Sequence, residues 1–231
     1  MNLKSFLTKL FLGQEILEKV ISPINGEITV VEDIFGRRKV LVGGLTQSGG
    51  LVEKLWRKAI SNLPAGRQGK QLAIRNCLIL GLGCGSIARL ITDHCPLFTK
   101  ITGVEIDPVM IEIGRKYFRL DEIKNLEIVI GDAIEKVKSQ KSKFNLIIVD
   151  LYLGKEFPKG AESEEFLNGL RDILAKDGLV IFNRLYYDKD QREKADKFLE
   201  KIRQFFPQVE IRRAITNLLI YASSEAEKRY N

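Results

Sequence analysis

The sequence has few of the residues that build disulfide frameworks, zinc sites and histidine-based catalytic pairs. Its 231 residues include three cysteines, none in C-x-x-C spacing, and one histidine. Zinc sites and disulfide frameworks need more sulfur or imidazole groups at closer spacing. We therefore expect no metal ligands and a reducing, cytoplasmic compartment. The single histidine, His94, lies near a predicted helix end, where we expect a capping or surface role.

Long apolar runs are also missing, which argues against a signal peptide and a membrane-spanning helix. Hydrophobic residues in the first twenty positions recur instead at helical spacing, between lysines and a glutamate. They are Leu3, Phe6, Leu7 and Leu10. This pattern predicts an N-terminal helix, through Val20, that docks on the fold or mediates a homodimer. An interfacial membrane helix is a less favoured alternative.

Acidic residues are absent from positions 54–92, although the chain as a whole has a net charge of +7. A solvated basic face is the favoured interpretation of this stretch. The alternative is a positive rim that steers an anionic substrate or a nucleic acid toward a binding site. The basic residues are Lys54, Arg57, Lys58, Arg67, Lys70, Arg75 and Arg89.

What the sequence does have is a regular alternation of apolar runs and amphipathic segments from Cys77 onward, in a chain that is 45% hydrophobic. Such alternation predicts an α/β domain with a parallel sheet and helices on both faces. The predicted strands are 77–82, 100–105, 126–130, 144–149 and 178–183, and the predicted helices are 86–95, 108–119, 132–140, 162–176 and 189–206. Two further strands, 209–213 and 218–221, are too close for a crossover helix, so we expect an antiparallel hairpin.

A different pattern precedes this series. Residues 26–42 contain two apolar runs around Phe35-Gly36-Arg37-Arg38, which predicts a β-hairpin with a glycine turn. We therefore expect two parts: residues 1–48, a small subdomain of one helix and a hairpin, and residues 49–231, a Rossmann-like domain. An amphipathic helix from Leu51 to Leu63 opens the second part.

The stretch from Cys77 to Pro108 predicts a site for a nucleoside. Gly81, Gly83 and Gly85 lie between an apolar run and a helix, where glycine lets the backbone turn sharply and approach a ligand. Glu105 ends the next strand, about 20 residues further on, and a carboxylate there can accept hydrogen bonds from ribose hydroxyls.

The following strands also end in acids. Gly131-Asp132-Ala133 and Asp150-Leu151-Tyr152 each follow an apolar run. Ligands of open parallel sheets bind beyond the carboxyl ends of the strands, so these side chains are expected to share one site. Asp132 suits an exocyclic amine such as that of adenine, and Asp150 is left to face the reacting group or the acceptor.

These motifs resemble those of spermidine synthases and their relatives, polyamine aminopropyltransferases within the class I S-adenosylmethionine-dependent methyltransferase fold. The similar segments are Val104–Val109, Gly131–Ala133, Ile147–Asp150 and Gly44–Gln47, which matches the family's DGxxQ segment. The resemblance implies a donor, S-adenosylmethionine or its decarboxylated form. Its site would comprise the three glycines, Glu105 with Ile106, Asp132 with Ala133, and Gln47 as a cover. Asp150 would help to deprotonate the acceptor.

The chain departs from this family where a polyamine would bind. Cys84, Gly43 and Leu153 replace acids, and Trp56-Arg57-Lys58 replaces a Tyr-His-Glu-like segment. A diamine needs carboxylates for its ammonium groups, and Arg57 and Lys58 would repel it. The favoured function is therefore transfer of a methyl or related alkyl group to a small, non-diamine acceptor, which could be anionic, with Trp56 and Tyr152 as its candidate contacts.

Three alternatives remain open. Aminopropyl transfer from decarboxylated S-adenosylmethionine follows from the overall resemblance. A non-catalytic module that binds a nucleoside or a nucleic acid would use the basic residues of 54–92. An NAD-linked oxidoreductase would use Gly83–Ala88 as a GxGxxA motif, but it leaves Gln47 and Asp132 unexplained.

Overall fold

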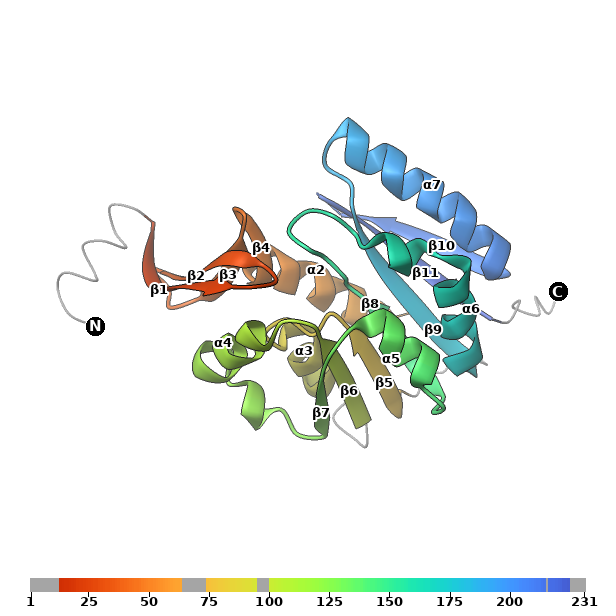
Figure 1. Ribbon diagram of the computed structural model, residues 1–231, viewed down its shortest axis with the longest axis horizontal. Helices are drawn as coiled ribbons and strands as arrows, with labels where there is room; N and C mark the ends of the chain where they lie inside the picture. The colour runs from red at the N-terminus through yellow and green to blue at the C-terminus, as the bar shows by residue number, and fades with distance from the viewer. Residues whose placement is uncertain (1–12, 64–73, 95–99, 215, 225–231) are drawn as a thin grey trace.

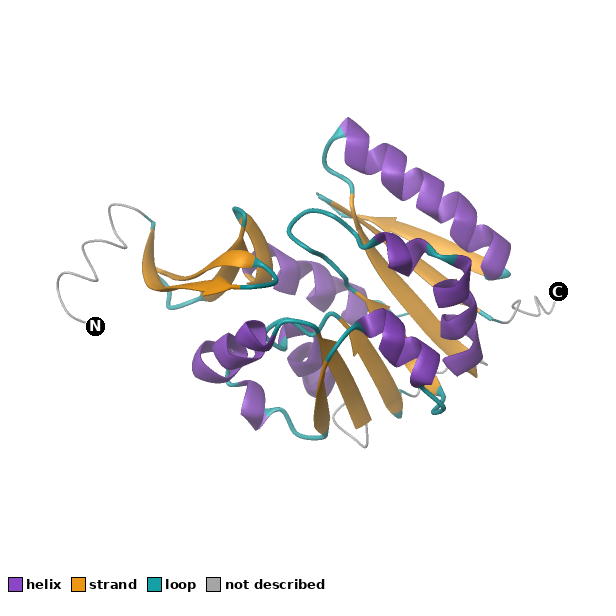
Figure 2. Cartoon of the chain, viewed as in Figure 1, coloured by secondary structure: helices purple, strands orange, loops and turns teal. Residues whose placement is uncertain are grey.

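The computed structural model describes residues 13–63, 74–94, 100–214 and 216–224, which form two β-sheets and the helices around them (Figure 1; Figure 2). The larger sheet has seven strands in the order β10-β11-β9-β8-β5-β6-β7. Strands β5 to β9 are parallel, and β11 pairs antiparallel with both β9 and β10. This confirms the predicted α/β fold with a C-terminal antiparallel hairpin. The strands are β5 Asn76–Leu80, β6 Lys100–Glu105, β7 Leu126–Ile130, β8 Phe144–Val149, β9 Leu174–Leu185, β10 Gln208–Arg213 and β11 Asn217–Ser223.

Helices cover both faces of this sheet (Figure 1). On one face lie α2 Gly50–Ser61, α3 Ser86–His94 and α4 Pro108–Phe118; on the other lie α5 Ala133–Ser139, α6 Glu164–Ile173 and α7 Lys189–Phe205. Their amphipathic patterns produce this arrangement, because each buries one apolar stripe on the sheet. The helix predicted over 162–176 ends earlier, since β9 begins at Leu174. Within the described residues, no helix is long and apolar enough to cross a membrane.

The N-terminal part is a four-stranded antiparallel sheet, which contains the predicted hairpin around Gly36 together with two further strands. Its strands are β1 Gln14–Ser22, β2 Gly26–Asp33, β3 Arg38–Val42 and β4 Leu45–Gly49. The expectation of a helix through Val20 is wrong for residues 14–20, because β1 satisfies its backbone hydrogen bonds by pairing with β2. Gly13, with φ +73°, separates β1 from the apolar pattern that suggested a helix. That pattern, residues 3–10, lies outside the described residues.

The small sheet packs on the larger domain through side chains and hydrogen bonds. Ile28, Val30 and Val42 form one apolar cluster with Met110 and Ile113 of α4. At the β1–β2 turn, Ser22 Oγ and Asn25 Nδ2 each donate a hydrogen bond to Asp107 Oδ2, with a donor–acceptor distance of 2.5 Å in both cases. Asp107 is fully buried and also caps α4, accepting from Val109 N. The turn is therefore fixed to the β6–α4 junction.

Candidate functional site

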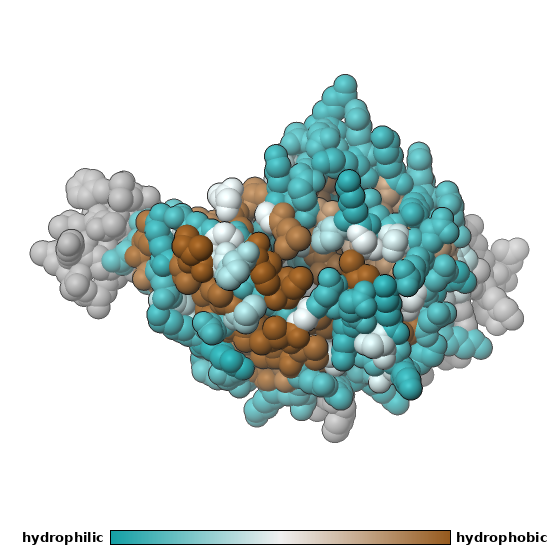
Figure 3. All heavy atoms as spheres, in the orientation of Figure 1, coloured by the Kyte–Doolittle hydropathy of each residue, from teal (hydrophilic) through white to brown (hydrophobic). Residues whose placement is uncertain are grey.

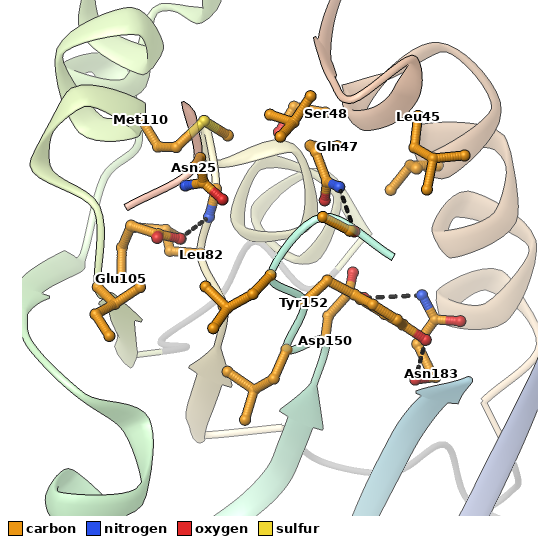
Figure 4. A pocket seen from close by; sticks show the side chains of 18 of the residues that line it. Asn25, Leu45, Gln47, Ser48, Leu82, Glu105, Met110, Asp150, Tyr152 and Asn183 are labelled. Carbon is orange, nitrogen blue, oxygen red and sulfur yellow. Dashed lines mark hydrogen bonds between the residues drawn. The ribbon is translucent and has the colours of Figure 1, made fainter. Parts of the chain in front are cut away.

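A cavity of about 510 Å³ opens at the carboxyl ends of the parallel strands, where β4 and α2 approach them. Figure 3 shows hydrophobic side chains gathered on the face where the small sheet meets the larger domain, and Figure 4 shows the cavity from close by. We call the walls formed at β5, β6 and β7 the β5–β7 side. The walls formed by α2 and at β8, β9 and β11 are the β8–β11 side. The two sides meet between β5 and β8, neighbours in the sheet.

The turn after β5 brings main chain to the cavity surface. Gly81 has φ +90° and Gly83 has φ +55°, and both line the cavity. A Cβ on Gly81 would collide with the Asp150 carbonyl oxygen, and one on Gly83 would lie 3.0 Å from Ser48 Oγ. Gly85 differs from its sequence-based prediction: it lies outside the lining, and its missing Cβ makes room for Leu120.

Glu105, at the end of β6, is 8% exposed and faces the cavity (Figure 4). Its Oε2 accepts from Gly83 N at 2.7 Å and its Oε1 accepts from Asp107 N at 3.0 Å. Burial raises the pKa of Glu105, and these backbone hydrogen bonds oppose that effect. Each carboxylate oxygen has a second lone pair, so the side chain can also accept from the two hydroxyls of a ribose.

Residues after β6 and β7 line the adjoining wall. Ile106 is 39% exposed beside Glu105, and Ala133 is buried at the start of α5. Asp132 caps α5, with Oδ1 accepting from Ile134 N at 2.6 Å. The structure thus brings Asp132, Ala133, Ile106 and Glu105 to one side, as the strand-end rule predicts.

Asp150, after β8, lies across the cavity from Glu105 (Figure 4). Its Oδ2 accepts from Trp56 Nε1 and its Oδ1 accepts from Asn183 Nδ2, both at 2.8 Å. Burial raises the pKa of Asp150, and the two hydrogen bonds oppose the rise. A held carboxylate with a raised pKa suits a general base.

The sequence did not predict the residues that extend this interaction. Asn183, near the end of β9, accepts through Oδ1 from Asn217 Nδ2 at 2.9 Å. Asn217 Oδ1 in turn accepts from Thr216 Oγ1 at 2.7 Å. All three line the cavity. Asn183 interrupts an apolar run and could have been found as a polar strand-end residue, whereas Asn217 comes there only through the β9–β11 pairing.

Tyr152 and Trp56, the two residues predicted to contact the acceptor, differ in their position relative to the cavity. Tyr152 lines the cavity, and its hydroxyl donates to the Asn183 carbonyl at 3.0 Å and accepts from Leu185 N at 2.8 Å. Trp56 has no exposed surface and lies outside the lining, so it supports Asp150 and does not form the wall. Trp56 belongs to the buried stripe of α2, with Ala59 and Ile60.

Gln47, on β4, closes the cavity from the N-terminal sheet. Its Nε2 donates to the Gly154 carbonyl at 3.2 Å, joining β4 to the loop after β8 (Figure 4). Ser48, next to it, accepts from Cys84 N at 3.1 Å. Cys84 itself is 1% exposed and lies outside the lining, and burial raises the pKa of its thiol to about 12.

The cavity is acidic. Its described lining includes Glu105, Asp132 and Asp150 but no lysine or arginine. Arg57 lies on the exposed side of α2, paired with Glu53 at 2.5 Å, and Lys58 is also exposed. None of the described basic residues of 54–92 lines the cavity, so Arg57 and Lys58 lie outside the wall that the sequence had placed them near.

Comparison with known proteins agrees with this geometry. The family model of the spermine/spermidine synthase domain matches residues 53–228, more than half of the chain. The chain belongs to the spermine/spermidine synthase domain family. This confirms the resemblance found in the motifs.

Proteins with two different names are similar to it. A polyamine aminopropyltransferase of Neisseria meningitidis serogroup B is 32% identical over 55% of this chain and 47% of its own length. An eEF1A lysine and N-terminal methyltransferase homolog of Drosophila pseudoobscura pseudoobscura is 29% identical over 58% of this chain and 21% of its own. The chain thus spans less than half of either relative.

A solved structure supports the fold assignment. A crystal structure of spermidine synthase in complex with the transition state analogue AdoDATO superposes with a TM-score of 0.75. The match covers 91% of this chain and 74% of that chain, at 21% sequence identity.

Proposed function

We propose that this protein is a transferase that binds S-adenosylmethionine, or a close analogue, and moves a methyl or related alkyl group to a non-diamine acceptor. The observation that carries the proposal is Glu105, buried at the end of β6 with each oxygen held by a backbone N–H. The glycine turn lies beside it and Asp150 lies across the cavity. This arrangement suits a nucleoside on one side and a nucleophile on the other.

The residues divide the work between binding and proton transfer. Glu105 binds the ribose hydroxyls, Asp132 the adenine amine, and Gln47 restricts the access of water from the N-terminal sheet. When bound, the donor supplies a sulfonium, which is already a good leaving group. Asp150 accepts a proton from the acceptor nucleophile, and Trp56 and Asn183 hold the carboxylate in position.

Donor binding is tested by calorimetry with S-adenosylmethionine. We expect Glu105→Ala to weaken binding by about 10- to 100-fold, since hydrogen bonds to a charged group are worth about 1.5–3 kcal/mol. Glu127→Ala, which removes an exposed carboxylate paired with Lys100, should bind as the wild type does. Absence of binding at millimolar donor, or equal binding by the Glu105 variant, would contradict the proposal.

Aminopropyl transfer is the second candidate, supported by the acidic cavity and the family. It requires carboxylates for the donor ammonium and for both ends of a diamine. Cys84 offers none, because its thiol is buried away from the cavity, and Leu153 offers an apolar side chain. Incubation with putrescine and decarboxylated S-adenosylmethionine tests it: formation of spermidine at a rate above that of any methyl transfer would reverse our order.

A further inference from the structure

The β8–β11 side of the cavity contains one carboxylate among its described residues. Asp150 lies there, whereas Glu105 and Asp132 lie at the ends of β6 and β7, beyond β5 in the sheet. The rest of the β8–β11 wall is uncharged. It is formed by Leu51, Val52, Leu151, Tyr152, Leu153, Gly154, Asn183, Leu185, Tyr187, Thr216 and Asn217.

From this wall we infer the acceptor class: a monoamine, in which a single amino group is attached to an apolar arm. The inference rests on the proposed transferase function and names its acceptor. The amino group would lie at Asp150 and the arm along the uncharged wall toward the mouth.

The charge of the cavity favours a cationic acceptor. Three carboxylates and no described lysine or arginine line it. An anionic acceptor would therefore meet uncompensated negative charge at Asp150, whereas an ammonium would be attracted to that carboxylate. The sulfonium of the donor supplies one positive charge, and the ammonium form of the acceptor supplies a second. This argument replaces the expectation that the acceptor could be anionic.

The amide groups beside Asp150 are held in a neutral chain. Asn183 uses its Nδ2 on Asp150 and its Oδ1 on Asn217, so neighbours fix the orientation of its amide. Thr216 fixes Asn217 in the same way. An amide oxygen can accept a hydrogen bond from an ammonium, but it brings no negative charge to offset desolvation.

The mouth of this side is apolar. Leu51 is 62% exposed, Leu153 is 45% exposed and Tyr187 is 38% exposed, and all three line the cavity. These side chains can cover the carbon chain of a bound amine. A second ammonium at the far end of that chain would lie beside leucine, with no second carboxylate among the described residues of this side to pair with it, which disfavours diamines.

The transfer balances with the groups present. The acceptor enters as R–NH₃⁺ and gives one proton to the Asp150 carboxylate. Its nitrogen lone pair then forms a bond to the methyl carbon as the carbon–sulfur bond breaks, and that electron pair stays on sulfur as a neutral thioether. The product leaves as R–NH₂⁺–CH₃, and Asp150 returns its proton to solvent.

A matched pair of amines tests the inference. With S-adenosylmethionine as donor, n-hexylamine and 1,6-diaminohexane differ by one terminal ammonium. Methylated product is measured by mass spectrometry and kcat/KM is compared. We expect n-hexylamine to be preferred at least 10-fold. A preference for the diamine, or equal use of both, would overturn the inference.

Leu51→Asp provides a second test, with Leu51→Asn as the neutral control. Position 51 is exposed and lies in the first turn of α2, where an acid is compatible with the helix. We expect Leu51→Asp to raise kcat/KM for the diamine about 10-fold over Leu51→Asn, which loses the same apolar contact but adds no charge. If neither variant changes kcat/KM for either amine, the assignment of Leu51 to the acceptor wall is wrong.

The two proposals fail in different ways. If calorimetry shows that the protein binds S-adenosylmethionine but neither amine is methylated, the monoamine assignment is wrong and the donor assignment stands. If S-adenosylmethionine does not bind, the proposed function is wrong and the acceptor assignment falls with it.

Discussion

At the scale of single residues, Asp150 carries the chemistry that we propose, because it is the carboxylate on the acceptor side of the cavity. Two opposing effects act on its pKa. Burial disfavours the charged form, whereas hydrogen bonds donated by Trp56 and Asn183 favour it. The balance leaves its pKa above the ordinary value of 3.8. A base in this state holds a proton more readily than an exposed aspartate does.

We expect Asp150→Asn to lower turnover by about 10²- to 10⁴-fold, the usual contribution of a general base. Donor affinity should change little, because the residues proposed to contact the ribose and the adenine, Glu105 and Asp132, lie on the other side of the cavity. Single-turnover methyl transfer and donor calorimetry measure the two effects separately. An equal loss in both would show that Asp150 acts in donor binding instead.

The pH dependence gives a second prediction. The carboxylate form of Asp150 is the active base, so the rate should rise as pH increases through its raised pKa and fall below it. Trp56→Phe removes a hydrogen bond that favours the charged form and should move this limb upward by about one pH unit. The kcat–pH profile measures the shift, and Tyr117→Phe, near the end of α4 and outside the cavity lining, is the control. An unmoved limb would exclude Asp150 as the titrating group.

At the scale of elements, the β5–α3 turn depends on backbone space. Gly81 approaches the Asp150 carbonyl so closely that no Cβ fits, whereas Gly154, also at positive φ, has nothing within 4 Å. The position of the turn after β5 therefore depends on the position of the Asp150 main chain, which belongs to the other side of the cavity.

This contrast predicts that a Gly→Ala substitution lowers the free energy of unfolding by different amounts at the two positions. Gly154→Ala should lower the free energy of unfolding by about 1 kcal/mol, from backbone strain alone. Gly81→Ala should cost about 3 kcal/mol or more, because main chain must move. Chemical denaturation measures both, and similar costs would mean that the turn adapts more easily than the structure indicates.

The elements also show what a sequence can reveal about a site. Glu105, Asp132 and Asp150 were found because each directly follows an apolar run, and the carboxyl ends of parallel strands share one edge. The same reasoning could not place Asn217, which depends on an antiparallel register with β9, or Ser22, which meets Asp107 through a contact between two sheets. Trp56 was assigned to the wall from the resemblance, by its position after Gln47, although the apolar stripe that it shares with Ala59 and Ile60 indicates the buried face of α2.

At the scale of the whole molecule, the N-terminal sheet is part of the site as well as a neighbour of it. β4 supplies Gln47 and Ser48 to the cavity, and the β1–β2 turn is held by Asp107. Since Asp107 N also donates to Glu105, the residue that joins the two sheets lies two positions from the carboxylate proposed to bind the ribose.

We therefore expect Ser22→Ala to loosen the small sheet. Loss of its hydrogen bond to a buried carboxylate should cost about 1–3 kcal/mol. Hydrogen exchange should increase in residues 14–26 and donor affinity should fall. Thr29→Ala, on the adjacent strand, is a control for changes in β2 itself. Unchanged exchange in β1 would show that apolar packing alone holds the sheet.

The order of strands in the large sheet has a consequence for synthesis on the ribosome. Strands β5 to β8 are complete once residue 150 has been made. By then the chain also contains the three carboxylates of the described cavity lining, so the proposed nucleoside side can form early. β11 pairs with β9 but follows it by about 30 residues. Until residues 217–223 emerge, the growing chain lacks the partner of β9 and has no Asn217, so the proposed nucleoside side would form before the proposed acceptor side is complete.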